Sequence, residues 1–290
     1  MKGDFFMNNE KNKKIWLKKC EETLRMGGRS EITARNYCYA IERFLNSYSN
    51  DTRISKMSVD DIIKYFRKNF LNKNLSANTY NFNLAAVRYF YLICFERNIS
   101  RTLLPTSNIR KRFPTIVSKE QFLNIVNNES NLEHKCWYLL SFCCGLRVSE
   151  IATLKIENIN SREHKLKIIG KGNKERYTIL PDIVIKYLRL YYKSKNYKFS
   201  TGYLFKGIEL NEHISPRTIG NSFTNLKKEY NLSKEITEHS LRHSFATYYL
   251  KNGGDILILK TMMGHKTLTS TSIYVHMSQD FNNLEGIKYV

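Results

Sequence analysis

Three apolar stripes at helical spacing in the first hundred residues constrain the fold of this chain more than any other feature. Each stripe follows a serine that can cap a helix, at Ser30, Ser58 and Ser76. Their members are Tyr37, Ile41, Phe44, Leu45 and Tyr48; Val59, Ile62, Ile63, Phe66 and Phe70; and Tyr80, Leu84, Val87, Tyr91 and Phe95. A weaker helix from Lys13 to Met26 precedes them. The pattern therefore predicts a four-helix bundle over residues 10–98.

The faces opposite these stripes carry basic and amide side chains. A solvated surface is the ordinary interpretation of such residues, and contact with a DNA backbone is the sharper one. The candidates for DNA contact are Arg35, Arg43, Asn78, Asn81 and Arg88. Residues 99–116 then lose the helical period, contain two prolines and carry the cluster Arg110, Lys111, Arg112. They predict a linker that could also cross a DNA backbone.

Residues 117–290 predict a second domain that is also mostly helical. A capping-box pattern at Ser118 opens a helix through Val126, and an apolar helix runs from Leu132 to Cys144. Prolines at 181 and 216 each start a further amphipathic helix. Together with the bundle, these elements predict a mainly α chain.

A two-residue period over residues 165–180 predicts a β-hairpin. Its apolar positions are Leu166, Ile168, Tyr177 and Ile179. Gly170-Lys171-Gly172-Asn173 forms its turn, with a lysine at the tip. The turn lacks the GxxxxGK[ST] spacing of a phosphate-binding P-loop. The fold class is therefore mainly α with a small β-hairpin or sheet (α+β).

The charge balance favours a polyanionic partner. The chain has 47 Lys and Arg against 26 Asp and Glu, a formal net charge of +21. Such an excess raises the encounter rate with nucleic acid. A membrane surface is the weaker alternative, because the basic residues are spread along the chain instead of lining one amphipathic helix.

The apolar and cysteine patterns indicate a cytoplasmic protein. The six cysteines show no metal-finger or CxxC spacing and most lie in apolar runs, which is typical of reduced core residues. No secretory signal is evident at the lysine-rich N-terminus. The longest apolar run, Trp137 to Leu146, is too short to span a membrane.

The stretch from Thr237 to His276 concentrates reactive side chains. They are His239, Arg242, His243, His265 and Tyr274. If residues 240–252 form a helix, His239 and Arg242 point to the same side of its first turn, where a helix favours anions. A guanidinium donates two hydrogen bonds to phosphoryl oxygens and imidazoles move protons, so the set suits a phosphate diester with Tyr274 as candidate nucleophile.

Glycines divide this stretch. Gly253 and Gly254 end the first helix, Asp255 can cap the next, and Gly264 ends that one and leaves His265 on a loop. Zinc held by His239, His243 and His265 is a weaker alternative, because no carboxylate base follows in the HExxH manner.

An arginine lies just behind the buried helix of the second domain. Arg147 follows the apolar run and Gly145, and Glu150 comes three residues later. A guanidinium there is costly to bury unless it is paired, so we expect an anion or Glu150 close to Arg147.

With these residues collected, the whole chain resembles the tyrosine recombinases, the family of phage-type integrases and Xer-type resolvases. The matching phrases are GLRVSE, GKGNKER, HSLRHSFAT, MMGHK and TSIYVH, in the order of the family. The resemblance implies an N-terminal core-binding domain, a C-terminal catalytic domain and DNA contacts from Lys174 and Arg176. It implies no cofactor and no metal, because arginines supply the positive charge.

The resemblance also implies the chemistry of the site. Tyr274 would attack a DNA phosphate and form a 3′-phosphotyrosyl bond, without ATP. Arg147 and Arg242 would hold the non-bridging oxygens in the transition state. Lys171 would protonate the departing 5′-oxygen, which requires a pKa below the ordinary lysine value.

The resemblance also implies supporting roles in this reaction for three histidines and for one carboxylate. His239 would act as general base or acid for the tyrosine, and His265 would hydrogen-bond the phosphate. Glu150 and His243 would orient Arg147 and the helix.

The resemblance predicts a homotetramer acting on two double-stranded DNA sites, as a mobile-element integrase or an Xer-like resolvase. A final apolar stripe, Phe281, Leu284 and Ile287, could close the chain's own core or dock onto a neighbour. The alternatives are a type IB-like topoisomerase, which reseals one duplex as a monomer, and a DNA-binding regulator without catalysis.

Overall fold

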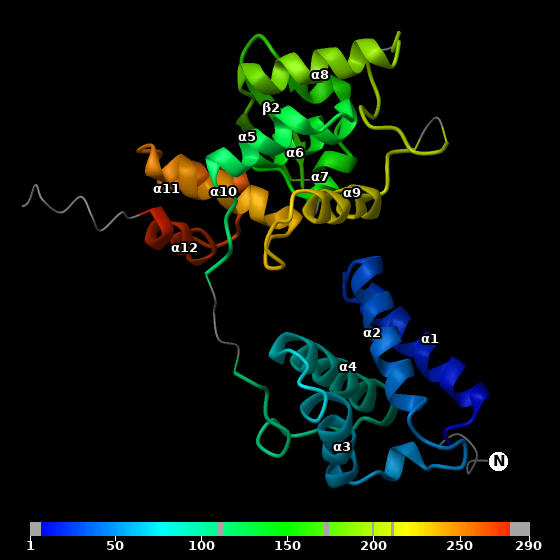
Figure 1. Cartoon of the computed structure of the whole chain (residues 1–290). Coiled ribbons are helices and arrows are strands. Elements are labelled where there is room, and N and C mark those ends of the chain that lie inside the picture. Colours follow the sequence, from blue (N-terminus) through cyan, green and yellow to red (C-terminus); the bar gives the residue numbers. More distant parts are fainter. Residues whose placement is uncertain (1–6, 109–112, 171–173, 199, 210–211, 279–290) are drawn as a thin grey trace, which may run out of the picture. The chain divides into compact units, whose positions relative to one another are not determined.

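The computed structural model describes residues 7–108, 113–170, 174–198, 200–209 and 212–278. The chain divides into two compact units, residues 1–111 and 112–290, and each is considered by itself (Figure 1).

The N-terminal unit is the predicted bundle. Its helices are α1 (Glu10–Met26), α2 (Glu31–Leu45), α3 (Val59–Phe66) and α4 (Ala77–Phe95), with a 3₁₀ turn η2 (Ile54–Lys56) and a π-helical turn η3 (Arg67–Leu71). The hydroxyls of Ser30, Ser58 and Ser76 accept hydrogen bonds from backbone N–H groups of the first turns, as predicted. Trp16 and Phe44 are fully buried in its aromatic core.

The bundle extends further along the chain than the predicted boundary at residue 98. Ile99 and Leu104 are 2% and 3% exposed and belong to the bundle core. The first part of the predicted linker therefore packs on α4, because it carries apolar side chains that burial stabilises.

The C-terminal unit is built around α6. Its helices are α5 (Lys119–Asn128), α6 (Leu132–Cys144), α7 (Val148–Ala152), α8 (Asp182–Ser194), α9 (Pro216–Glu229), α10 (Glu238–Lys251), α11 (Ile256–Met263) and α12 (Thr269–Ser278), with a 3₁₀ turn η4 (Ile156–Asn158). Helices α8 and α10 both pack against α6 (Figure 1). Trp137 and Leu140 place α6 in the core of this unit. The stripe predicted at Phe281, Leu284 and Ile287 lies outside the described residues.

The predicted hairpin is part of a three-stranded antiparallel sheet in the order β1 (Ile159–Asn160), β2 (Lys165–Ile169), β3 (Glu175–Ile179). The prediction that Tyr177 and Ile179 form the buried face of β3 is wrong. Tyr177 and Ile179 are 55% and 40% exposed, whereas Thr178 is 3% exposed. Thr178 is paired with Leu166, and Arg176 with Ile168, so Thr178 and Arg176 share the buried face of β2.

Candidate active site

Helix α10 begins two residues before the predicted start. Thr237 caps it, and the side chain of Ser240 accepts a hydrogen bond from the backbone N–H of Thr237 at 3.0 Å. His239 lies exposed in the first turn, while Arg242 is 4% exposed and points into the unit. The two side chains therefore do not share one environment, although they are three residues apart.

The Arg242 guanidinium donates hydrogen bonds to carbonyls at the C-terminal ends of two other helices. Its Nη1 donates to the carbonyl of Gly145, which caps α6, and its Nη2 donates to the carbonyl of Met263, the last residue of α11. Helix C-termini carry partial negative charge, so they stabilise a buried cation. Gly145 has a φ of +70°, and a Cβ there would collide with the ring of Phe245. This close approach requires glycine.

Glu150 balances the charge of the site. Its Oε2 accepts from the backbone N–H of Arg147 at 2.8 Å and from Nη2 of Arg176 at 2.8 Å, and lies 3.6 Å from Nη1 of Arg242. Its Oε1 accepts from Nη1 of Arg147 at 2.9 Å. The expected proximity of Arg147 and Glu150 is confirmed. Burial would raise the pKa of Glu150, but the hydrogen bond and charge of Arg176, with Arg147 and Arg242, hold it below the ordinary value.

Tyr274 lies on α12, and its side chain is buried at 3% exposure. Its hydroxyl lies 2.7 Å from Nδ1 of His243. The ring of His265 stacks on that of Tyr274 at 6.3 Å, and Nδ1 of His265 lies 2.9 Å from the hydroxyl of Thr271. The residue against the tyrosine hydroxyl is therefore His243, and His239 instead lies 3.3 Å from the carboxylate of Glu238.

Burial and the arginines keep both inner histidines neutral. Burial, His239 and Arg242 lower the pKa of His243 to about 4. Burial, Arg242 and Arg147 lower the pKa of His265 to about 4. A neutral His243 can accept the hydrogen bond of a phenol at pH 7.

The same charges act on the tyrosine and on Arg242. Burial raises the pKa of Tyr274, while the charges of Arg242 and Arg147 oppose that rise. Burial and neighbouring guanidinium groups lower the pKa of Arg242 to about 9, which leaves it charged at neutral pH.

Four of the predicted catalytic residues thus lie in one positively charged site: Arg147, Arg242, His265 and Tyr274. Glu150 and His243 lie beside them. His239 is at the exposed end of α10, and Lys171 falls outside the described residues.

The two remaining hairpin residues differ. Lys174 is exposed, as a DNA contact requires. The side chain of Arg176 is only 8% exposed and bonds to Glu150 and to the carbonyl of Met262. Strand register turns the Arg176 side chain inward in this structure, and the expected contact of Arg176 with DNA stays a prediction. The missed signal is its position opposite an apolar residue of β2.

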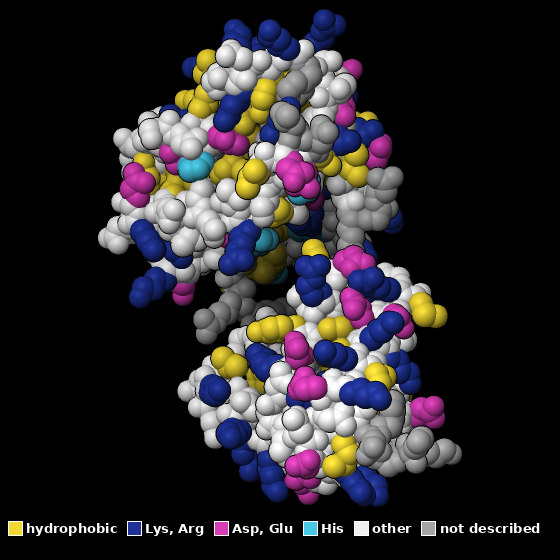
Figure 2. Space-filling model, turned by 90° about the vertical axis from the view of Figure 1, so that its right-hand side faces the viewer, with side chains coloured by type: hydrophobic (Ala, Val, Ile, Leu, Met, Phe, Trp, Pro, Cys, Tyr) yellow, Lys and Arg dark blue, Asp and Glu magenta, His cyan; other side chains and the backbone are white. Residues whose placement is uncertain are grey.

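The predicted DNA contacts of the bundle also divide. Arg35, Arg43 and Asn78 are exposed, although Arg43 also donates to Asn83. Asn81 and Arg88 instead contact the segment that follows α4. Figure 2 shows basic side chains spread over the visible face of the bundle.

Asn81 and Arg88 are engaged within the N-terminal unit. The amide of Asn81 donates to the carbonyl of Ser107 at 2.9 Å and accepts from its N–H at 2.8 Å. Arg88 donates to the carbonyl of Leu104, and burial lowers its pKa. The chain after α4 thus folds back over both side chains, and their expected contact with DNA stays a prediction. The cluster Arg110, Lys111, Arg112 lies outside the described residues.

The histidines do not form a metal site. Nδ1 of His243 lies against the Tyr274 hydroxyl, and Nδ1 of His265 lies against Thr271. Among the residues that the structure describes, no group of three or more His, Cys, Asp or Glu side chains is arranged to hold a metal ion. The zinc alternative therefore has no support in this geometry.

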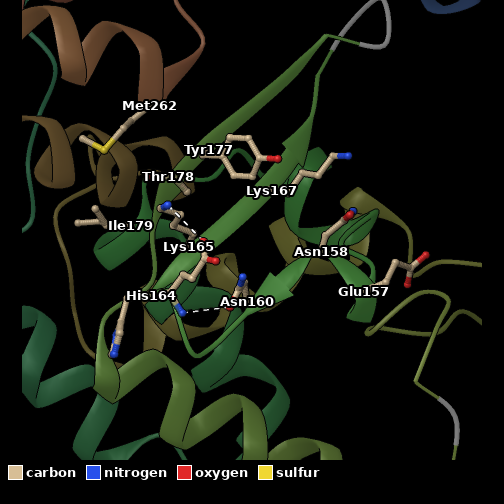
Figure 3. A pocket seen from close by; sticks show the side chains of 11 residues that line it. Glu157, Asn158, Asn160, His164, Lys165, Lys167, Tyr177, Thr178, Ile179 and Met262 are labelled. Carbon is tan, nitrogen blue, oxygen red and sulfur yellow. Dashed lines mark hydrogen bonds and ion pairs between the residues drawn. The ribbon is translucent and has the colours of Figure 1, made fainter.

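A hollow of about 540 Å³ lies on the sheet (Figure 3). Lys165, Lys167 and Tyr177 line it from β2 and β3, and His164 lines it from the turn before β2. None of the predicted catalytic residues is among its lining residues, so we do not assign the chemistry to it.

Two family models match the chain. The phage integrase family matches residues 117–280, and the phage integrase N-terminal SAM-like domain matches residues 16–101. No helix in the described part of the chain is long and apolar enough to cross a membrane.

Curated relatives match over most of their length. Tyrosine recombinase XerA of Pyrococcus horikoshii is 30% identical over 260 residues, 88% of this chain and 86% of the relative. Tyrosine recombinase XerD of Staphylococcus haemolyticus is 26% identical and covers 87% of this chain and 90% of the relative.

Solved structures share the fold. The lambda integrase (75–356) dimer bound to a COC′ core site has a TM-score of 0.70 at 18% identity and covers 95% of this chain and 98% of that one. The XerH recombinase bound to palindromic difH in a post-cleavage complex has a TM-score of 0.71 at 18% identity, covering 88% and 79%.

Proposed function

The chain belongs to the phage integrase family and is a site-specific recombinase of the tyrosine type, and we propose that it cuts and rejoins duplex DNA with Tyr274 as nucleophile. One observation carries this assignment. The Tyr274 side chain is buried in a site where the charges of Arg147 and Arg242 both act on its hydroxyl. A phenol in that position can meet a phosphate that the two guanidinium groups bind.

The proposed reaction exchanges one phosphate ester for another. The Tyr274 oxygen attacks the scissile phosphorus, the bond to the 5′-oxygen breaks, and a 3′-phosphotyrosyl bond forms. Lys171 supplies the proton to the departing 5′-oxygen. A 5′-hydroxyl from the partner strand then attacks the phosphotyrosyl bond and releases the tyrosine, so no energy source is consumed.

Two guanidinium groups stabilise the transition state in this scheme. Arg147 and Arg242 donate to the non-bridging oxygens as negative charge develops on them. Removal of one such donor costs about 3 to 4 kcal/mol of activation free energy. The carboxylate of Glu150 keeps both cations in place without occupying the exposed part of Arg147, whose side chain is 37% exposed.

Two histidines are candidates to take the phenolic proton. Nδ1 of His243 already contacts the hydroxyl, at 2.7 Å. His239 is exposed one turn earlier on α10, where a bound DNA strand can reach it. We assign His265, held through Thr271, to hydrogen bonding with the phosphate.

The proposed partner is double-stranded DNA, bound by a homotetramer that joins two sites. The net charge of +21 supports a polyanionic partner. The exposed Arg35, Asn78 and Lys174 are the proposed contacts to the DNA backbone, with the linker cluster at residues 110–112. The cytoplasm, where such DNA is accessible, is the proposed location.

Covalent trapping in cells tests the nucleophile. The wild-type chain should be recovered with DNA joined to it, and Tyr274→Phe should bind the same DNA without forming an adduct. Tyr177→Phe, which changes an exposed tyrosine of the same unit, is the matched control and should form the adduct. An adduct that persists in Tyr274→Phe would show that another residue is the nucleophile.

The recovered DNA also defines the biological reaction. Its sequence distinguishes a mobile-element integrase from a chromosome-dimer resolvase. Joining of two labelled copies, with a four-way junction as intermediate, supports the tetrameric recombinase. Relaxation of a single duplex by a monomer, without junctions, would instead indicate a topoisomerase.

A further inference from the structure

The proposed chemistry leaves a buried guanidinium beneath the hairpin without a role. Arg176 is on β3, and its side chain is 8% exposed. Its strand neighbours Glu175 and Tyr177 are exposed. Burying a cation in a three-stranded sheet is costly, so its partners must compensate the lost hydration.

Arg176 joins three elements of the C-terminal unit. From β3, its Nη2 donates to Oε2 of Glu150 in α7 at 2.8 Å. Its Nε donates to the carbonyl of Met262 in α11 at 2.7 Å. A planar guanidinium can satisfy both acceptors at once, and a lysine ammonium lacks that fork geometry.

The atoms that Arg176 contacts also fix the two proposed phosphate-binding arginines. Oε2 of Glu150 accepts from the backbone of Arg147 at 2.8 Å and lies 3.6 Å from Nη1 of Arg242. The next carbonyl of α11, that of Met263, accepts from Nη2 of Arg242. Arg176 and Arg242 therefore share the Glu150 carboxylate and each donate to one of two consecutive carbonyls of α11.

The turn before His265 packs on the same side chain. Gly264 has a φ of +62°, and a Cβ there would lie 3.1 Å from Cδ and 3.2 Å from Nε of Arg176. A displacement of Arg176 would therefore also change the support of this turn.

We propose that Arg176 is a positioning residue, which acts through Glu150 and the end of α11 to set the placement of Arg147 and Arg242 for the scissile phosphate. This inference rests on the proposed function. It predicts an effect on the rate of cleavage and no effect on DNA affinity, because only 8% of the Arg176 side chain is exposed.

Single-turnover cleavage by Arg176→Met tests the inference. The probe is a duplex with the sequence recovered by trapping, and affinity is measured separately in the uncleavable Tyr274→Phe background. Cleavage at saturating DNA should slow on the order of 100-fold, as for a small misplacement of catalytic groups. The dissociation constant should change by less than about twofold, because no phosphate contact is removed.

Lys167→Met is the matched control. It removes a cation from the paired strand, where Lys167 faces the hollow of Figure 3 and pairs with Glu175 at 2.7 Å. This variant should cleave within about twofold of the wild type, because a partly exposed ion pair contributes little. Arg176→Lys, which keeps the charge, should fold and still cleave slowly.

Combination with Glu150→Gln separates positioning from general stability. If Arg176 acts through the carboxylate, the double variant should cleave no more slowly than the slower single variant. Rates that multiply, or slow cleavage that matches the loss of folded protein in both Arg176 variants, would overturn the inference. Weakened DNA binding at an unchanged cleavage rate would also overturn it and make Arg176 a DNA contact.

The wild-type reaction distinguishes failure of the positioning role from failure of the proposed function. If the wild type forms an adduct and Arg176→Met forms it equally fast, the positioning role alone fails. If the wild type forms no adduct with any DNA, the proposed function fails, and the positioning role fails with it.

Discussion

Replacement of Glu150 by glutamine removes the charge that balances three guanidinium groups. The side chain of Glu150 is 7% exposed, and it contacts Arg147, Arg176 and Arg242. Glutamine has nearly the same shape, so the change isolates charge and hydrogen-bond polarity from packing.

The structure sets the size of the effect. If the amide oxygen takes the place of Oε2, it keeps the bonds from the Arg147 backbone and Arg176, now as neutral bonds. The amide NH₂ then faces Nη1 of Arg147, a donor against a donor. Breaking a buried pair costs about 3 to 5 kcal/mol, and solvent at the 37% exposed Arg147 reduces this. We expect about 2 to 4 kcal/mol of lost stability.

Urea unfolding measures this loss. A Trp16→Phe background leaves Trp137 as the only tryptophan, so its fluorescence reports the C-terminal unit. The midpoint should fall at an unchanged slope. Thermal unfolding should begin about 5 to 15 °C lower, given a unit of this size.

The control is Glu163→Gln, which removes an exposed carboxylate from a 3.2 Å pair with Lys165 and should cost less than about 0.5 kcal/mol. If Glu150→Gln also costs less than about 0.5 kcal/mol, the carboxylate does not balance the site, and our account of its charges is refuted.

Three further outcomes follow from the same site. His243→Ala should slow covalent adduct formation more than His239→Ala if the 2.7 Å contact between His243 and the tyrosine hydroxyl persists on DNA. The reverse order would indicate that His239 takes the phenolic proton. Lys171→Ala should fail to cleave an ordinary duplex but recover on one with a sulfur at the 5′-bridging position, which leaves without a proton; no recovery would contradict its role as general acid. Because folding lowers the pKa of His243 from 6.5 to about 4, the unfolded chain binds more protons than the folded chain between pH 4 and pH 6.5. Stability should therefore fall as the pH drops from 6.5 to 4, by about 1 to 2 kcal/mol after allowance for solvent screening. His243→Gln should reduce the pH dependence in urea unfolding at several pH values and leave the contribution of His265, whose pKa is also lowered to about 4; an unchanged slope would count against the role of His243.

Local elements were predictable because their causes are local. Serine caps and apolar spacing determine where the bundle helices begin and which faces they bury. Gly145 and Gly264 end helices with positive φ, and Arg147 pairs with a carboxylate three residues away. The order of short motifs was enough to recognise the family, since each motif can be read without its neighbours.

Contacts between distant segments required the tertiary structure. The alternation of residues in β3 did not decide which of its two faces is buried. Pairing with β2 turns Arg176 inward and Tyr177 outward. Asn81 and Arg88 have the polarity of DNA contacts, but the chain after α4 folds back and engages both.

The sequence by itself determined the two-part helical architecture and the candidate residues for phosphoryl transfer, because hydrophobic period, caps and motif spacing act over a few residues. Only the tertiary structure decided that His243 contacts Tyr274 and that one carboxylate serves three arginines. Those choices depend on how α7, α10, α11, α12 and β3 pack together. Packing sums many weak contacts between segments that are far apart in the sequence, which no local pattern records.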